Sequence, residues 1–363
     1  MLLHCADCGR PHPLTELAWR CADCQGVLDL AEFRPTMPTL DTLRHRRATL
    51  WRYAEALPIA EPVDLTMGEG MTPLVPSPGR PDVQLKVDYL TPTGSFKDRG
   101  AVLLAALAQQ LGVPRIVADS SGNAGTAVAA YAARAGIPCD IYVPASTSAG
   151  KVAQLRAYGA TVHQIPGSRE DTAAAAAVAA DRPGTFYASH VYHPFFLHGT
   201  KTYVLELWEQ LDGSLPDTLV LPVGNGTLVL GAYLGSRELL QQGLIERLPR
   251  IVAVQAAGCA PLAREFHDEP SIPDTGTIAE GIAIARPARG AQIVNAVRDT
   301  GGTIMTVTDH QVRAAHADLA RHGLYVEPTS AVCWAATADL ADVGRAVVPL
   351  CGSGLKSKPP TDE

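Results

Sequence analysis

Short runs of β-branched and other apolar residues alternate with longer Ala- and Leu-rich stretches from about Val83 onward. Short apolar runs bounded by turn residues are typical of strands in a parallel sheet, and the longer stretches are typical of helices. The predicted strands are 83–87, 115–118, 140–143, 161–165, 219–223, 251–254 and 346–350. The predicted helices begin near Gly100, Thr126, Ala149, Asp171, Thr200, Leu228, His310 and Ser330. This alternation predicts an α/β fold with open parallel sheets.

The length and composition of the chain limit the kind of protein it can be. With 363 residues it is too long for one small core, so we expect two domains and a short extra module. The apolar fraction of 47% is typical of a globular protein. A net charge of -7 argues against binding to nucleic acid, which requires clustered Lys and Arg. No stretch approaches the roughly 20 apolar residues that cross a bilayer, so we expect a small-molecule ligand and no membrane contact.

The N-terminal 30 residues contain two pairs of cysteines, Cys5 with Cys8 and Cys21 with Cys24. Paired thiols at this spacing are typical of a zinc ribbon, in which four thiolates fill the coordination shell of one structural zinc ion. The alternative is four reduced cysteines without a metal. We expect a cytoplasmic protein, because the N-terminus lacks the pattern of a signal peptide and thiols stay reduced in the cytosol. Residues 31–80 show little periodicity and are predicted to form a connecting arm.

A lysine lies where a helix is predicted to begin, in the segment Thr91–Gly100 (TPTGSFKDRG). The positive end of the helix dipole and partial burial disfavour the charged form of Lys97. A neutral amine is the form that attacks an aldehyde, so Lys97 is a candidate nucleophile. Taken alone, the segment is equally consistent with a surface lysine at the start of a helix.

Three further turns follow predicted strands, where open α/β sheets bind ligands. The first, Asp119–Thr126 (DSSGNAGT), can bind a carboxylate through Ser120, Ser121, Asn123 and main-chain amides. Glycines in the second, Pro222–Leu228 (PVGNGTL), would let amides surround a phosphate. The third, Val348–Leu355 (VPLCGSGL), contains Cys351, which is either an inert buried thiol or an uncharged partner for a ring nitrogen.

Together these segments resemble, in order and spacing, the motifs of threonine synthase and its relatives among the fold-type-II pyridoxal-phosphate enzymes. Two more segments are similar to motifs of that family, Met67–Leu74 (MGEGMTPL) and Val326–Ala331 (VEPTSA). The resemblance covers the chain after about Glu61, and the Cys-rich leader also occurs in some relatives. It implies a lyase of two open three-layer α/β/α domains with a zinc-ribbon-like module. The expected division is 1–30 for the module, 31–90 with 200–363 for the large cofactor-binding domain, and 91–199 for the small domain.

The resemblance also implies a role for each motif. Lys97 would hold pyridoxal phosphate as a Schiff base and move protons. Asn123 would bind the phenolic oxygen of the cofactor, and the substrate carboxylate would bind to Ser120, Ser121, Gly122 and Asn123. The cofactor phosphate would bind to Gly224, Asn225, Gly226 and Thr227. Cys351 would replace the Thr or Ser that faces the ring nitrogen in relatives, and a homodimer is implied.

The sequence departs from threonine synthases where the phosphate of O-phosphohomoserine would bind. Family members are expected to have a hydroxyl, an Arg and an Asn at the places of Ala124, Phe196 and Thr227. The surrounding stretch, His190–His198, is aromatic and rich in histidine, and a histidine is only partly charged near neutral pH. We therefore expect O-phosphohomoserine to be a poor substrate.

Three functions remain consistent with the sequence. The favoured one is a threonine-synthase-like lyase that eliminates or replaces a group at the β- or γ-carbon of an amino acid. The second is a Ser/Thr dehydratase or a β-replacement enzyme of the cysteine-synthase type. The third is a zinc-ribbon binding module attached to an inactive α/β domain, against which Lys97 and the glycine-rich turn at 224–227 both argue.

Overall fold

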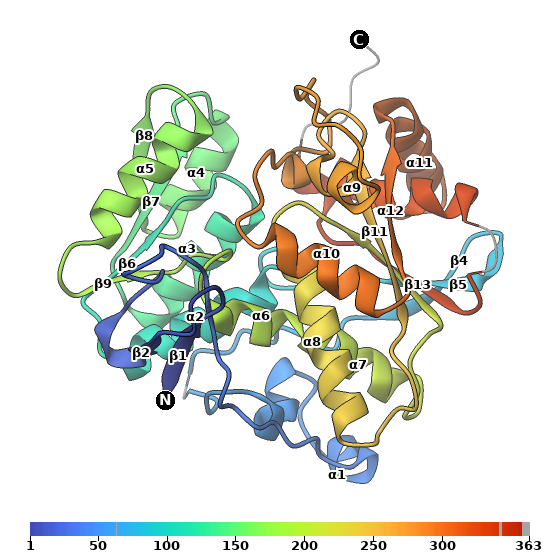
Figure 1. The fold of residues 1–363 in the computed structure, drawn as a ribbon, viewed down its shortest axis with the longest axis horizontal. Helices are drawn as coiled ribbons and strands as arrows, with labels where there is room; N and C mark the ends of the chain where they lie inside the picture. The colour runs from blue at the N-terminus through green and yellow to red at the C-terminus, as the bar shows by residue number, and fades with distance from the viewer. Residues whose placement is uncertain (63, 341–342, 358–363) are drawn as a thin grey trace. The chain divides into compact units, whose positions relative to one another are not determined.

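The chain forms two compact units (Figure 1). The computed structural model describes residues 1–62, 64–340 and 343–357. Unit 1 contains residues 1–36, 49–69 and 97–199, and unit 2 contains the described parts of 37–48, 70–96 and 200–363. The predicted large domain extends to residue 363, and its residues 341–342 and 358–363 lie outside the described part. No helix among the described residues is long and apolar enough to cross a membrane.

Unit 1 contains two sheets. The N-terminal sheet is antiparallel, in the order β2-β1-β3, and consists of β1 (Leu2–Cys5), β2 (Pro11–Pro13) and β3 (Leu28–Asp29). The second sheet is parallel, in the order β8-β7-β6-β9, and consists of β6 (Arg115–Ala118), β7 (Cys139–Pro144), β8 (Thr161–Ile165) and β9 (Thr185–Tyr187). Apolar residues on these strands form the core of the unit with the helices around them.

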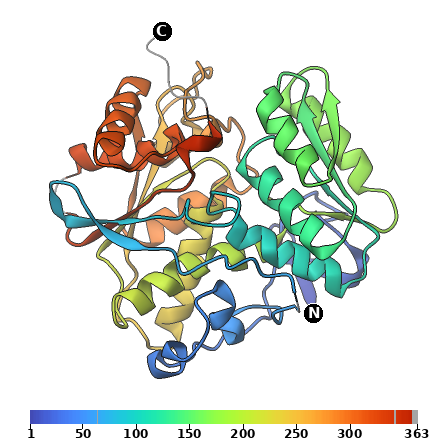
Figure 2. The same cartoon turned by 180° about the vertical axis from the view of Figure 1, so that it is seen from behind.

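The helices of unit 1 cover both faces of its parallel sheet. They are α2 (Asp98–Gln110), α3 (Asn123–Ala135), α4 (Ala149–Ala157) and α5 (Arg169–Ala180), and α6 (Pro194–Thr200) ends the unit. α3 and α4 carry the chain from β6 to β7 to β8, and α5 returns it to β9, so right-handed crossovers place α5 on the opposite face. Figure 1 shows α5 in front of the sheet, and the reverse view in Figure 2 shows α2 and α3, in teal, in front of it.

Residues 49–69, which the sequence predicts to be part of an irregular arm, pack into unit 1. Apolar residues of this segment, such as Leu50, Leu57 and Leu65, lie in the core of the unit. The segment also carries a fully buried carboxylate, Glu69, which needs hydrogen-bond donors because it has lost its hydration. Four groups donate to it at 2.8 to 2.9 Å: the indole of Trp51, the hydroxyls of Thr66 and Tyr131, and the amide of Met67. Because Tyr131 lies on α3, Glu69 joins this segment to the helix that begins at Asn123.

Replacing Tyr131 by Phe is expected to lower the free energy of unfolding by about 1–2 kcal/mol, because it removes one donor from the buried Glu69 carboxylate. The change is measured by urea unfolding followed by circular dichroism. Tyr158→Phe is the control, since this partly exposed tyrosine of the same unit makes only a hydrogen bond of 3.3 Å with Gln154. Equal midpoints for the two variants would show that the Glu69 contacts contribute nothing specific.

Unit 2 contains one six-stranded sheet in the order β12-β11-β10-β13-β5-β4. The strands are β4 (Leu74–Ser77), β5 (Arg80–Lys86), β10 (Thr218–Pro222), β11 (Arg250–Ala256), β12 (Thr303–Val307) and β13 (Ala346–Pro349). Neighbouring strands are parallel except β4, which runs antiparallel to β5. Because β10 and β13 are parallel neighbours, the turns that follow them lie at the same edge of the sheet.

Helices cover both faces of this sheet as well. The helices of unit 2 are α1 (Leu40–Arg44), α7 (Thr202–Gln210), α8 (Thr227–Gln241), α9 (Pro261–Phe266), α10 (Gly290–Asp299), α11 (Asp309–Arg321) and α12 (Pro328–Ala336). The connections through α8 and α10 run from β10 to β11 to β12, and those through α11 and α12 return to β13, so the two pairs lie on opposite faces. Figure 1 shows α8 and α10 on the near side.

Candidate functional site

Lys97 lies at the N-cap of α2 and faces aromatic side chains of its own unit. Its Nζ is 5.7 Å from the ring centroid of Phe196, a fully buried residue of α6. The Phe196 ring packs directly on Gly100, where a Cβ atom would come within 2.5 Å of it. The rings of His190 and Phe196 are 5.9 Å apart. Phe196 therefore contributes hydrophobic ring surface beside Lys97, where relatives are expected to have an Arg.

The histidine whose ring packs near Phe196 does not supply the missing positive charge. His190 is buried, and its pKa is held well below the ordinary value of 6.5, first by burial and then by the positive charges of Lys97 and Arg169. A group whose pKa is lowered in this way is neutral near pH 7. Near pH 7 the ring of His190 therefore adds no positive charge beside Phe196.

The buried lysines of the described chain are ion-paired, unlike the partly exposed Lys97. Lys86 Nζ is 2.8 Å from a carboxylate oxygen of Glu206, and both side chains are fully buried. Lys201 Nζ is 2.7 Å from Glu238. Burial lowers the pKa of Lys201 to about 8, and the Glu238 carboxylate opposes that shift. Both lysines are committed to these structural contacts.

The 119–123 loop connects β6 to α3 in unit 1, at the carboxyl end of its strand. Ser120 Oγ accepts a hydrogen bond of 3.3 Å from the amide of Gly122. Asn123 is the first residue of α3, whose first turn has no acidic residue. Gly125 lets the helix approach the loop, since a Cβ atom there would lie 1.8 Å from the Ser120 carbonyl oxygen. A helix start with this composition is suited to binding a carboxylate.

The 224–227 turn connects β10 to α8 in unit 2. Gly226 is the N-cap residue with φ of 72°, a left-handed conformation that favours glycine. The amides of the first turn of a helix have no acceptor within the helix, and the first turn of α8 has no acidic residue. Thr200 Oγ1 donates a hydrogen bond of 2.8 Å to the carbonyl of Thr227 and so fixes the start of α8. These features fit a phosphate-binding turn.

The turn that contains Cys351 follows β13 in the same sheet. Cys351 is buried, with 1% of its surface exposed, and its carbonyl accepts a hydrogen bond of 2.9 Å from the amide of Phe96, the residue before Lys97. The motif Val326–Ala331 supports this turn, since Gly352 accepts from the amide of Glu327 and donates to Ser330 Oγ at 3.0 Å. An uncharged thiol is thus held at the same sheet edge as the 224–227 turn.

The predicted site residues are divided between the two units. Unit 1 contains Lys97 with Ser120, Ser121, Gly122 and Asn123. Unit 2 contains Gly224, Asn225, Gly226 and Thr227 together with Cys351. Within unit 2, the pairing of β10 with β13 brings the last two groups to one edge. Sequence reasoning did not identify Thr200, which fixes α8, because nothing near it in the sequence indicates its partner.

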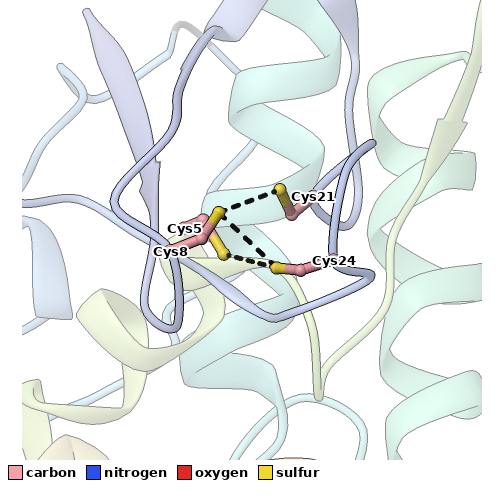
Figure 3. Close-up of side chains that lie close together, drawn as sticks. All are labelled: Cys5, Cys8, Cys21 and Cys24. Atoms are coloured by element: carbon pink, nitrogen blue, oxygen red, sulfur yellow. Dashed lines mark hydrogen bonds between the residues drawn. The ribbon is translucent and has the colours of Figure 1, made fainter.

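The four N-terminal cysteines form one cluster (Figure 3). Their sulfur atoms all lie within 4.8 Å of one another. The hydrogen-bonded pairs are Cys5 with Cys24 at 3.3 Å, and Cys8 with Cys21 and Cys24 at 3.6 Å. Four Zn–S bonds of about 2.3 Å in a tetrahedron separate the sulfurs by about 3.8 Å. The backbone amide of Cys24 is the main group that lowers the pKa of Cys21, to about 6, and a thiolate is the form that binds metal.

Comparison with known proteins gives the same class as the sequence motifs. Residues 65–352 match the family of pyridoxal-phosphate-dependent enzymes. The fold is similar to that of maize serine racemase, with a TM-score of 0.68 and 24% identity over 78% of this chain and 88% of that one. A fungal L-serine ammonia-lyase from Rhizomucor miehei gives a TM-score of 0.67 and 24% identity over 78% of this chain and 93% of that one. The chain belongs to the pyridoxal-phosphate-dependent enzymes of fold type II.

Sequence comparison with named relatives defines the place of the chain within this class more closely. The threonine synthase of Methanosarcina acetivorans is 35% identical over 94% of this chain and 87% of that protein. The threonine synthase of Mycobacterium leprae is 37% identical over 84% of this chain and 87% of that protein. The protein is therefore a threonine-synthase-like, pyridoxal-phosphate-dependent lyase, which confirms the favoured prediction.

Proposed function

We propose that this enzyme acts on an amino acid whose leaving group is uncharged, such as hydroxyl or acetyl, in preference to O-phosphohomoserine. The observation that carries the proposal is the fully buried Phe196 ring beside Lys97, 5.7 Å from its Nζ. A phosphate loses its hydration in such surroundings, and the Phe196 ring offers no charge in return. The test compares specificity constants for O-phosphohomoserine, L-threonine and O-acetyl-L-serine.

The residues of this chain would divide the work as the motifs imply. When bound, pyridoxal phosphate supplies an electron sink for the bonds at the substrate α-carbon. Lys97 Nζ would hold the cofactor covalently and then take and return the proton of the α-carbon. The 119–123 loop would bind the substrate carboxylate, with Asn123 donating to the phenolic oxygen of the cofactor. The 224–227 turn would bind the cofactor phosphate through its amides.

Cys351 would face the ring nitrogen of the cofactor. An uncharged thiol does not keep that nitrogen protonated as a carboxylate would. A neutral ring favours elimination and replacement at the β- or γ-carbon over transamination, because it withdraws electrons less strongly. The burial of Cys351, with 1% of its surface exposed, is consistent with such a role.

The Cys5, Cys8, Cys21 and Cys24 cluster is proposed to bind one structural zinc ion in a zinc-ribbon-like module. The separations among the four sulfur atoms support this proposal. Reduced thiols are stable in the cytosol, which is the proposed location of the enzyme. A homodimer is proposed by analogy with the family.

The purified protein is expected to contain one zinc ion per chain, and the Cys8→Ser/Cys24→Ser double variant none, because two of four ligands are lost. Metal analysis by mass spectrometry on freshly purified, reduced protein measures this. Cys259→Ser, a buried cysteine outside the cluster, is the control and should keep its zinc. Absence of zinc from the wild-type protein would contradict the assignment of a zinc-ribbon-like module.

A further inference from the structure

Trp19 lies in the N-terminal module, two residues before Cys21, and packs against the parallel sheet of unit 1. Its ring makes edge-to-face contacts with Tyr187 and Tyr192, each at a centroid distance of 5.0 Å. Its indole nitrogen donates a hydrogen bond of 3.0 Å to Asp181, which follows α5. Trp19 is buried, with 9% of its surface exposed, and it belongs to an apolar cluster with Val117, Tyr187 and the alanines of α5.

Tyr187 links Trp19 to the 119–123 loop. It lies in β9 opposite Val117 of β6, two residues before Asp119. The Tyr187 hydroxyl is hydrogen-bonded to the Asp119 carboxyl group, the first residue of the loop. Burial raises the pKa of Asp119 and the Tyr187 hydrogen bond opposes the shift, so this donor stabilises the carboxylate. The Tyr187 ring is therefore linked directly to the first residue of the loop.

Tyr192 makes the second contact with Trp19, at the other end of a short turn. Ser189 Oγ accepts hydrogen bonds of 3.3 Å from the amides of Val191 and Tyr192, which closes this turn. The turn includes His190, whose ring is 5.9 Å from that of Phe196. Trp19 thus contacts the tyrosines on both sides of the segment that carries His190.

We propose that Trp19 is a positioning residue that couples the metal-dependent order of the N-terminal module to the 119–123 loop. Metal binding fixes Cys21 and with it the backbone that carries Trp19, and the edge-to-face contacts transfer this constraint to Tyr187 and Asp119. The proposal deepens the proposed function and rests on it, because that function assigns the substrate carboxylate to this loop. The module then affects substrate binding without touching the substrate.

The test compares four variants of the cofactor-loaded enzyme: Trp19→Ala, Trp19→Phe, Tyr187→Phe and Trp334→Ala. Tyr187→Phe keeps the ring and removes only the hydroxyl, which binds Asp119 and Ser189, so it remains informative if Trp19→Ala fails to fold. Trp334 is the matched control, since it has the same exposed fraction of 9% and a similar indole hydrogen bond, of 2.9 Å, to Asp318 of unit 2. The readouts are hydrogen–deuterium exchange of the peptide that contains residues 119–124, and the apparent Kd for L-threonine from the absorbance of the bound cofactor.

Tyr187→Phe is expected to raise both the exchange rate and the apparent Kd about fivefold, the effect of losing one hydrogen bond. Trp19→Ala should raise both by at least as much. Trp19→Phe should stay close to the wild-type values, and Trp334→Ala should change neither. The Cys8→Ser/Cys24→Ser variant should also show faster exchange. Unchanged exchange in Tyr187→Phe would overturn the proposal. Faster exchange with an unchanged Kd would support the coupling and contradict the assignment of the loop to the substrate.

Discussion

Lys97→Ala is expected to lower kcat by about 10⁴-fold or more, because removing a nucleophile that bonds the cofactor abolishes the covalent step. The fold should remain intact, since Lys97 caps α2 without a side-chain cap hydrogen bond and the helix that follows is buried. The protein should keep its circular dichroism spectrum and lose the lysine adduct that borohydride reduction traps. Cofactor held by the 224–227 turn can remain bound non-covalently.

Lys97→Arg is the matched control for charge and length. A guanidinium stays protonated and does not react with the aldehyde, so this variant should be as inactive as Lys97→Ala. Activity in Lys97→Arg within about tenfold of the wild type would mean that the side chain acts only through its positive charge. Such a result would contradict a covalent role for Lys97.

O-Phosphohomoserine is expected to be a poor substrate, with a specificity constant about ten- to a hundredfold below that of the best uncharged-leaving-group substrate. This range corresponds to the loss of one charge-assisted hydrogen bond, worth about 1.5–3 kcal/mol. Phe196 stands where an Arg is expected, and the low pKa of His190 keeps that neighbour neutral near pH 7. An acetyl or hydroxyl leaving group avoids this cost, because it carries no charge to desolvate.

The measurement is a set of initial rates for O-phosphohomoserine, L-threonine and O-acetyl-L-serine with one preparation of enzyme. Repeating the set at pH 6 and pH 8 tests the role of His190. His190, whose pKa lies well below its ordinary value, adds no positive charge at pH 8, where the substrate phosphate, with a second pKa of about 6, carries most of its second negative charge. The discrimination against O-phosphohomoserine should therefore be at least as large at pH 8 as at pH 6. A clear preference for O-phosphohomoserine at either pH would contradict the substrate proposal.

The central strands and their turns could be predicted from the sequence. β6 and β8 have the predicted bounds, β10 differs from prediction by one residue at each end, and β13 differs by one residue at its C-terminal end. β6, β10 and β13 are mainly apolar runs that stop at a Gly-containing turn, so local composition indicates where they lie. For the same reason, the site motifs at the ends of β6, β10 and β13 could be recognised in the sequence.

Other elements gave no comparable local signal. β9 has only three residues, Thr185–Tyr187, too few to show a period. β12 (Thr303–Val307) mixes polar and apolar residues, and it packs against α9 and α12. α10 begins at Gly290, a residue that does not favour helix, and is stabilised by burial of its apolar face. The sequence therefore predicted neither strand and did not predict α10.

The residues that support the site were the least predictable part. Glu69 belongs to a motif recognised in the sequence, yet its hydrogen bond to Tyr131 joins residues 62 positions apart. Lys201 and Glu238 are 37 positions apart. Such pairs are brought together by packing of whole helices, and one sequence contains no record of that proximity. By contrast, each residue predicted to bind cofactor lies in a motif with its own turn or helix start.

Peptide mapping after borohydride reduction tests the central claim most directly. The cofactor-loaded wild-type enzyme is reduced, digested and analysed by mass spectrometry for pyridoxyl-lysine. The expected result is a single modified peptide that contains Lys97, with Lys86 and Lys201 unmodified because both are buried in ion pairs. A pyridoxyl group on any other lysine, or on none, in enzyme that is active and loaded with cofactor would contradict the account.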